Sequence, residues 1–105
     1  MESMARLNDK TKDHTITSTA EIELLTINKT TSGRTGVVGK IKPTVAGTIS
    51  IYEKDNAGTA TLVTSGAALA NQWTYLKVNL PLDTAVLRFT PGTGSGSLQA
   101  RLTMF

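Results

Sequence analysis

The sequence predicts an all-β protein: a single antiparallel, jelly-roll-like β-sandwich of roughly seven to eight short strands. Apolar and polar residues alternate with a period of two in several segments, as in strands that bury one face and expose the other. These segments recur about every 8–12 residues, with Gly, Pro, Asn and Asp between them, which is typical of sandwiches and barrels. A chain of 105 residues forms one domain of common size with a single core.

Two regions are expected: a flexible N-terminal arm over residues 1–15 and a β-sandwich domain over residues 16–105. Residues 1–14 show no apolar period, and their charges are balanced. Termini without an apolar pattern are seldom ordered alone. A short edge strand is expected only at residues 15–17, where Thr and Ile alternate.

The expected strands are bounded by turn residues. In the strand AEIELLTIN the apolar phase changes by one residue between Leu24 and Leu25, which indicates a β-bulge. Gly39, in the middle of its strand, indicates a bulge or a close approach of the backbone. Residues 65–71, SGAALAN, are expected to form a loop with one helical turn, because seven residues are too few for a stable helix. In chain order the expected strands cover residues 20–28, 37–42, 46–54, 59–64, 73–80, 84–90 and 97–104.

The stretch 73–90 has the densest apolar content and is expected to form the hairpin-like pair against which the rest packs. Its strands would be joined by a tight connection at residues 81–83, because Pro81 lacks an N–H and suits the end of a strand. The apolar phase of each strand gives the predicted core. It comprises Ile22, Leu24, Ile49, Ile51, Leu76, Val78, Leu80, Leu87, Phe89, Leu98 and Leu102.

The net charge of +3 is spread over the strands rather than gathered in one patch. This distribution predicts solvated outer faces and argues against nucleic acid as a partner. No apolar run approaches the ~20 residues of a membrane span, so no membrane association is expected. The first residues lack the apolar segment of a secretory signal. The chain has no Cys, which excludes a disulfide framework and a thiolate zinc site.

Residues with catalytic chemistry are few, and neither an enzymatic activity nor a cofactor is expected. No carboxylate spacing around His14, the one histidine, resembles a metal-ligand set or a catalytic triad. Glu21 and Glu23 share the outer face of a strand, about 7 Å apart. Such a pair suits glycoside hydrolysis, but exposed carboxylates on a half-solvated strand are the simpler interpretation. The glycines of residues 91–96, PGTGSG, lack the Lys and the helix of a phosphate loop.

Three aromatic residues fall on the polar phase of their strands. Tyr52, Trp73 and Tyr75, with Arg88 beside them, form a candidate face for a glycan or another protein, and Lys54 and Lys77 are expected as further neighbours. Aromatic rings stack on the apolar faces of sugars, while neighbouring polar groups bind hydroxyls. Two other interpretations stay open: Trp73 and Tyr75 cap the core at a bulged strand end, or they pack in a subunit interface.

The C-terminal run GAALANQWTYLKVNLPLDTAVLRFTPGTGSGSLQARLTMF resembles small β-sandwich proteins of tailed bacteriophage particles. These families include head decoration (cement) proteins and tail or fibre modules. The resemblance covers about residues 20–105 and lies in Thr-, Gly- and Ser-rich strands, a Trp-Tyr strand, and an AVLRF strand after a Pro turn. It implies a virion component, made in the host cytoplasm, that has no cofactor and functions through repeated weak contacts on an assembled lattice.

The function favoured by this resemblance is that of a capsid decoration (cement) protein on the assembled shell. Its partner would be the major capsid protein or another virion protein. The alternative is a jelly-roll carbohydrate-binding module, or a receptor-binding or tail module of a phage. A homo-oligomer is also expected, with a trimer favoured, because the sheet edges carry few guarding prolines or inward charges.

The arm is expected to bind the partner. Met4 and Leu7 offer too little apolar surface to offset an ordering cost of ~1–2 kcal/mol per residue in the free protein. On a partner, Leu7 would insert, and Arg6 and Lys10 would pair with carboxylates. The arm would therefore become ordered on binding, as a strap on a neighbouring subunit or capsid protein.

Overall fold

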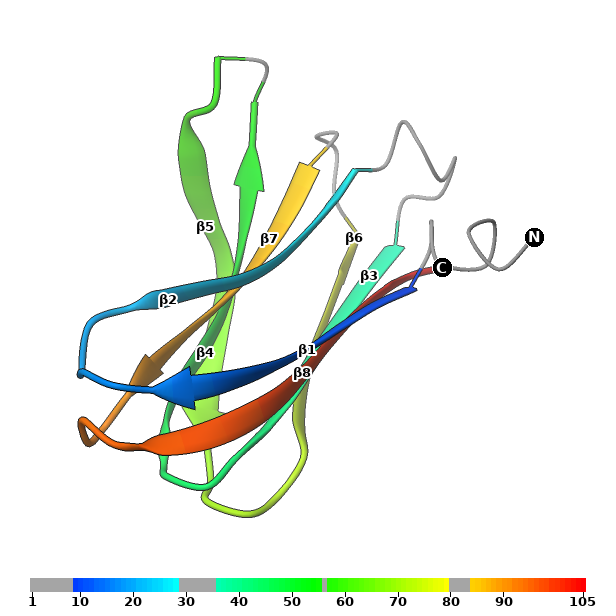
Figure 1. The fold of residues 1–105 in the computed structure, drawn as a ribbon. Coiled ribbons are helices and arrows are strands. Elements are labelled where there is room, and N and C mark those ends of the chain that lie inside the picture. Colours follow the sequence, from blue (N-terminus) through cyan, green and yellow to red (C-terminus); the bar gives the residue numbers. More distant parts are fainter. Residues whose placement is uncertain (1–8, 29–35, 56, 80–83) are drawn as a thin grey trace.

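The computed structural model of the chain describes residues 9–28, 36–55, 57–79 and 84–105. In these ranges the regular structure is entirely β (Figure 1), and they contain no helix that could span a membrane. The strands are β1 (Asp9–Ile16), β2 (Ile22–Asn28), β3 (Gly36–Pro43), β4 (Gly47–Lys54), β5 (Ala60–Ala68), β6 (Thr74–Asn79), β7 (Thr84–Pro91) and β8 (Gly96–Met104).

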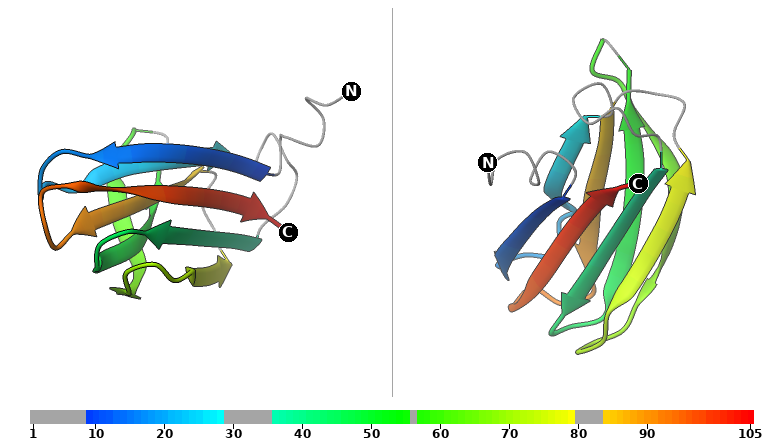
Figure 2. Two further views of the ribbon diagram at one scale, coloured as in Figure 1. Left: turned by 60° about the horizontal axis from the view of Figure 1, so that its bottom comes forward. Right: turned by 90° about the vertical axis from the view of Figure 1, so that its right-hand side faces the viewer.

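These eight strands form two antiparallel sheets packed face to face (Figure 2). Sheet A has the order β1-β8-β3-β6, and sheet B has the order β2-β7-β4-β5. The first strand therefore pairs with the last, β2 with β7, β3 with β6, and β4 with β5. Such nested pairing is a long hairpin folded over into two layers, which is the jelly-roll arrangement. The predicted fold class is confirmed.

The core lies between the sheets and is built from the apolar phase of each strand. Ile49 and Ile51 of β4 lie opposite Phe89 and Leu87 of β7, and all four side chains are fully buried. Every predicted core residue that the structure describes is buried or packs against the core, and only Leu80 lies outside the described residues. The structure adds Ile16, Ile27, Val37, Ile41, Ala68, Ala85, Ala100 and Met104.

The expectation of a flexible arm over residues 1–15 is wrong for residues 9–15. Asp9–Ile16 is an eight-residue strand that pairs with β8 along its whole length. Only its last residue, Ile16, is a buried apolar side chain, so the segment shows no apolar period. Its order comes instead from backbone hydrogen bonds to β8, which the local pattern does not reveal. Residues 1–8, with Met4, Arg6 and Leu7, lie outside the described residues.

The expectation of a hairpin-like pair over residues 73–90 is also wrong. β6 lies at the edge of sheet A beside β3, whereas β7 lies inside sheet B between β2 and β4. The connection at 80–83 lies outside the described residues. A strand with one apolar face can bury it in either arrangement, so alternation alone did not distinguish a hairpin from a crossing between sheets.

The helical turn expected at residues 65–71 is wrong for residues 65–68, which continue β5. They pair with residues 47–50 of β4, and Ala68 is buried. The small side chains lie in an edge strand whose partner fixes the backbone, so pairing overrides their helix propensity. Asn71 follows in a turn with a positive φ of 61°.

The bulge predicted in β2 is confirmed, because the register with β7 shifts between Glu23 and Leu25. At Gly39 the register is regular, so the alternative of close packing is the correct one. A Cβ added there would lie 2.8 Å from Cδ1 of Leu87. A second bulge, between Ile51 and Tyr52, was not predicted.

Candidate functional site: the outer face of sheet A

The side of sheet A that faces away from the core carries a regular array of polar, basic and aromatic side chains. The strand register defines this outer face (Figure 2, right, has sheet A in front). Lys40 is near its centre, because it lies opposite Arg101 of β8 on one side and Tyr75 of β6 on the other. From β1 to β6 the face comprises Asp9, Thr11, Asp13, Thr103, Arg101, Gln99, Val38, Lys40, Lys42, Lys77 and Tyr75, with Trp73 and Phe105 flanking it.

Three aromatic rings on this face are open to solvent. The exposed fractions are 47% for Trp73, 67% for Tyr75 and 44% for Phe105. The Phe105 ring lies over Gly36, to which its backbone is joined by two hydrogen bonds. A Cβ at Gly36 would overlap this ring, so the glycine is what leaves room for it. Exposed rings of this size on one sheet are typical of interaction surfaces.

Two lysines lie over these rings. The Nζ of Lys40 is 4.9 Å from the centroid of Trp73, and the Nζ of Lys77 is 5.0 Å from the centroid of Phe105. Both distances suit cation–π attraction. Among the residues that the structure describes, neither ammonium has a carboxylate within salt-bridge distance. An ammonium over a ring keeps hydrogen-bond donors available, so both lysines can still bind an anion.

Arg101 is engaged within the face. Its Nε donates to Oδ1 of Asp9 at 2.9 Å, its Nη2 donates to Oδ2, and the Thr103 hydroxyl donates to Oδ1 at 3.1 Å. The hydrogen bonds from Arg101 lower the pKa of the Asp9 carboxyl, and the same pairing raises the pKa of Arg101. These hydrogen bonds fix the start of β1 to β8. Within the described part of the chain, the lysines of the array are then its cations without a salt bridge.

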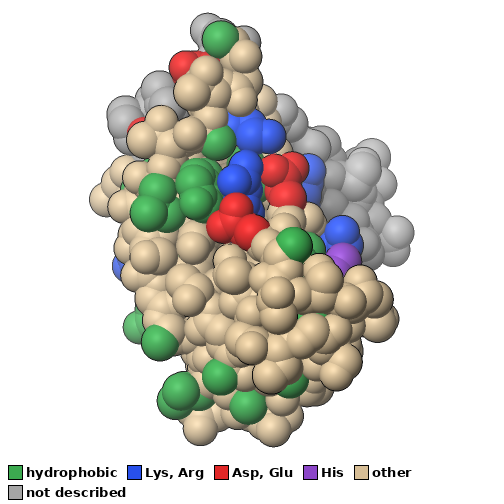
Figure 3. Space-filling model, turned by 90° about the vertical axis from the view of Figure 1, so that its left-hand side faces the viewer, with side chains coloured by type: hydrophobic (Ala, Val, Ile, Leu, Met, Phe, Trp, Pro, Cys, Tyr) green, Lys and Arg blue, Asp and Glu red, His purple; other side chains and the backbone are tan. Residues whose placement is uncertain are grey.

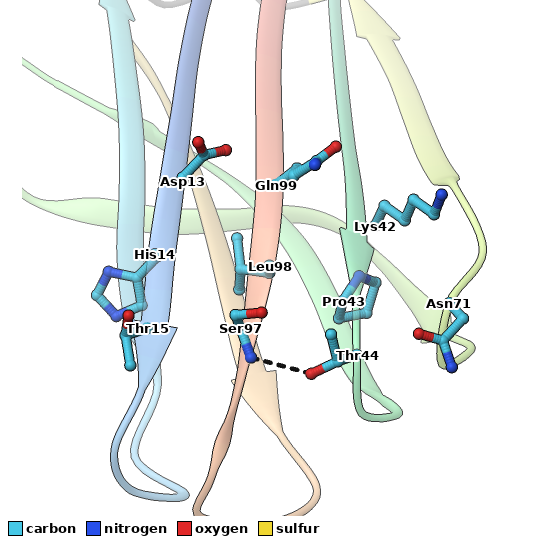
Figure 4. A pocket seen from close by; sticks show the side chains of 10 residues that line it. All are labelled: Asp13, His14, Thr15, Lys42, Pro43, Thr44, Asn71, Ser97, Leu98 and Gln99. Carbon is cyan, nitrogen blue, oxygen red and sulfur yellow. Dashed lines mark hydrogen bonds between the residues drawn. The ribbon is translucent and has the colours of Figure 1, made fainter.

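The face holds two shallow hollows. The polar hollow, of about 320 Å³, lies over the ends of β1, β8 and β3 (Figure 4). In it the Ser97 N–H donates to Oγ1 of Thr44 at 2.9 Å. The basic hollow, of about 390 Å³, is lined by Val38, Lys40, Lys77, Arg101, Thr103 and Phe105. The residues of the polar hollow are Asp13, His14, Thr15, Lys42, Pro43, Thr44, Asn71, Ser97, Leu98 and Gln99.

The outer face of sheet B is different, because its central cation is already paired. The two terminal nitrogens of Arg88 donate to Glu21 at 3.2 Å and to Glu23 at 3.3 Å, and Lys54 lies 3.6 Å from Glu23. The guanidinium also lies 4.3 Å from the centroid of the Tyr52 ring. Its buried Nε has no hydrogen-bond partner in the described part of the chain. Figure 3 views the molecule from this side and shows basic and acidic side chains in one mixed cluster.

The four residues of the predicted glycan or interface face do not form one surface. Trp73 and Tyr75 lie together on sheet A, whereas Tyr52 and Arg88 lie on the opposite side of the sandwich, on sheet B. The period of each strand gave the correct outward phase. It did not show to which sheet a strand belongs, since that depends on pairing between distant segments.

Sequence reasoning missed Phe105 and Lys40 as site residues, whereas Lys77 was expected near the aromatic residues. The alternation of the last strand places Phe105 on the outer phase, next to Met104, and this was the available signal. Of the residues assigned to the arm, Lys10 lies in β1 on the phase of Ile16, away from the array. Lys10 and Lys12 are therefore charges that point toward the core side of an edge strand, a common guard against edge pairing. The expectation of unguarded edges is wrong at β1.

Catalytic arrangements are not found among the described residues. They contain no group of three or more His, Cys, Asp or Glu side chains that could hold a metal ion. Glu21 and Glu23 are paired with Arg88, and His14 lies at the rim of the polar hollow. What the outer face of sheet A can do chemically is to stack, hydrogen-bond and attract anions.

Comparisons with known proteins give structural similarity without sequence similarity. No protein-family model matches the chain, and no curated protein matches it. Among solved structures, the PBSX exported protein XepA has a TM-score of 0.81 at 17% identity, over 91% of this chain and 36% of XepA. The SPBc2 prophage-derived protein YomS has a TM-score of 0.55 at 16% identity, over 90% of this chain and 93% of YomS. The Yersinia pseudotuberculosis-derived mitogen has a TM-score of 0.62 at 10% identity, over 93% of this chain and 86% of the mitogen.

The chain thus spans about a third of the length of XepA, in which this fold is one part of a longer protein. At these identities the comparisons show the fold. Two of the three neighbours are of phage or prophage origin, in line with the resemblance seen in the sequence. The chain is a jelly-roll β-sandwich whose structural neighbours include phage-derived proteins.

Proposed function

We propose that this protein is a non-enzymatic structural component of a bacteriophage virion that binds another virion protein through the outer face of sheet A. The observation that carries the proposal is the asymmetry of the two faces. Sheet A presents exposed rings and, among the described residues, lysines without carboxylate partners, whereas on sheet B Arg88 and Lys54 are paired with Glu21 and Glu23. The phage-derived structural neighbours support the proposal that the protein belongs to a bacteriophage.

A broad protein surface suits the outer face of sheet A better than a small molecule does. The rings of Trp73, Tyr75 and Phe105 are spread over β6 and the end of β8, and the two hollows are shallow. Trp, Tyr and Arg are enriched at protein interfaces, where aromatic residues contribute much of the binding energy. In its finer form the proposal is a capsid decoration (cement) protein, with the major capsid protein as partner and a trimer as the favoured oligomer.

The test is cosedimentation with empty capsid shells of the source phage that were assembled without this protein. Saturable binding in a fixed stoichiometry is expected. The double variant Trp73→Ala/Tyr75→Ala should lose most of it, and Leu62→Ala should not, because Leu62 is an equally exposed apolar residue on sheet B. No binding to shells or tails, or full binding of the double variant, would contradict the proposal.

A second candidate is the binding of a carbohydrate, either as a free-standing module or as the receptor-binding part of a tail. It is favoured by the polar hollow, where Asp13, Gln99 and Asn71 supply donors and acceptors of the kind that bind hydroxyls (Figure 4). Trp73 and Tyr75 lie on the neighbouring strand as stacking surfaces. Binding of the isolated protein to a glycan array, abolished by Gln99→Ala, would favour this candidate over the first.

A further inference from the structure

We infer that the lysines of the outer face of sheet A form a linear site for an extended acidic segment of a partner protein, with carboxylates at alternate positions. This inference rests on the proposed function and specifies its partner. The site runs along β3 and β6 and consists of Lys77, Lys40 and Lys42, with the basic hollow between Lys77 and Lys40.

The strand register sets the spacing of the site. Lys40 and Lys42 are two residues apart on β3, so their Cα atoms lie about 7 Å apart on the same face. Lys77 lies opposite Val38, one such step before Lys40. The Cα atoms of the three lysines therefore belong to three successive rows of the sheet, while the ammonium groups of Lys40 and Lys77 reach over the rings of Trp73 and Phe105. Side chains at alternate positions of an extended peptide have the same repeat of about 7 Å as these Cα atoms, so each carboxylate can meet one lysine when the long lysine side chains turn from the rings toward it.

The lysines can bind the carboxylates of a partner, whereas the neighbouring cation, Arg101, is already occupied. Arg101 is held by Asp9, while Lys40 and Lys77 contact aromatic rings and, among the described residues, no carboxylate. The basic hollow between them has an apolar lining from Val38 and Phe105. A carboxylate at the end of an apolar stem, as in Glu, fits such a site, because the stem packs on the apolar lining and the charge meets the ammonium groups.

The shape of the charged row favours a peptide over a nucleic acid. The row covers the two neighbouring strands β3 and β6, and Asp9 and Asp13 lie on the same face on β1, two strands from β3. A duplex that covered the whole face would bring its phosphates near these carboxylates. An extended peptide laid along β3 and β6 covers neither carboxylate, although Asp9 is near enough to Lys40 for the lysine charge to help lower its pKa.

Trp73 supplies the signal for the test. It is the only Trp in the chain, and the ammonium of Lys40 lies over its ring. An anion that draws this ammonium away should change the fluorescence of the indole. The full chain is titrated with a synthetic peptide of alternating Thr and Glu, with a peptide of the same composition in which the Glu residues form one block, and with an oligothymidine of equal charge.

The expected result is saturable binding of the alternating peptide, weakened about tenfold or more by Lys40→Gln/Lys77→Gln. The matched control is Lys12→Gln/Lys54→Gln, which removes the same charge from β1 and from sheet B and should change the affinity by about twofold at most. Equal weakening by both double variants, equal binding of the block peptide, or tighter binding of the oligothymidine would each overturn the inference. Calorimetry with the same ligands detects any binding that leaves the fluorescence of Trp73 unchanged.

A second arm separates this inference from the proposed function. If Lys40→Gln/Lys77→Gln still binds shells fully while Trp73→Ala/Tyr75→Ala does not, the inference fails and the proposed function stands. If the parent protein binds no virion component but binds the alternating peptide with the expected lysine dependence, the proposed function fails and the acidic-segment site stands.

Discussion

The two outer faces of the sandwich carry similar types of side chain, but the faces differ in whether these side chains are already paired. Each has a basic residue against an aromatic ring: Lys40 over Trp73 on sheet A, and Arg88 over Tyr52 on sheet B. On sheet B the guanidinium of Arg88 also pairs with two carboxylates. The residue opposite Tyr52 in the register, Val86, is fully buried although it is on the outer phase of its strand. On sheet A the ring is half exposed and the lysine has no carboxylate partner among the described residues.

The difference teaches that composition does not identify a binding face. Cations and aromatic rings occur on both sides, and a sequence scan marks them all. What separates the faces is whether the charges and rings are already satisfied within the molecule. A face whose charges are paired with one another stabilises the fold. A face with exposed rings and unpaired ammonium groups can still gain free energy by binding a partner.

The largest expected effect comes from the core that both faces share. Replacing Phe89 by Ala should lower the free energy of unfolding by about 3–5 kcal/mol, because the ring is fully buried between the sheets. Phe105→Ala removes the same side chain from the outer face of sheet A and should cost about 1 kcal/mol or less. Urea denaturation followed by circular dichroism measures both. Equal losses would mean that Phe105 belongs to the core and not to a binding surface.

An intermediate effect is expected on sheet B. Arg88→Ala leaves Glu21 without its partner, leaves Glu23 with Lys54 alone and uncovers the Tyr52 ring, so it should cost roughly 1–2 kcal/mol of stability. Lys40→Ala should change stability by less than about 0.5 kcal/mol, because its charge has no carboxylate partner among the described residues. The same denaturation experiment compares them. The contrast between the faces is lost if the lysine variant proves the less stable of the two.

An effect smaller than that of Arg88→Ala concerns Asp9–Arg101, the ion pair within the outer face of sheet A. Arg101 lowers the pKa of Asp9 in the folded protein, so the ionised carboxyl stabilises the fold above the ordinary Asp pKa of about 3.9. This contribution is lost as the pH falls through the lowered value. Asp9→Asn should therefore cost less than about 1 kcal/mol at neutral pH, and this cost should shrink as the pH falls below the ordinary Asp pKa.

Thermal melts of the parent protein and Asp9→Asn between pH 2 and pH 7 measure this dependence. The two curves should converge at acid pH and separate above it. Asp13→Asn, which removes a carboxyl group from the same strand, is the matched control. A constant offset between the parent protein and Asp9→Asn over the whole range would show that the carboxylate does not stabilise β1 through its charge.

The sequence predicted more of the fold than of the site, for a physical reason. Alternation within a strand determines which side chains are buried, so Ile49, Leu87 and Phe89 were placed correctly, and so was the bulge in β2. Pairing between distant strands determines which outward residues become neighbours. Trp73 and Tyr52 were therefore assigned to one face although they lie on opposite sheets.

Strand β1 shows the same limit at the chain terminus. Residues 9–15 have almost no apolar side chain to bury, and they are nevertheless ordered, because β8 supplies backbone hydrogen bonds and Arg101 holds Asp9. A pattern that records only hydrophobicity cannot detect a strand stabilised in this way.

The most direct test of the central claim, that sheet A carries the binding face, is hydroxyl-radical footprinting of the unmodified protein, free and bound to shells. The chain has one Trp and two Tyr, and they report on both faces: Trp73 and Tyr75 on sheet A, and Tyr52 with exposed Leu62 on sheet B. We expect oxidation of Trp73 and Tyr75 to fall strongly on the shells while that of Tyr52 and Leu62 stays unchanged. Protection of Tyr52 and Leu62, with Trp73 and Tyr75 as reactive as in the free protein, would contradict the account.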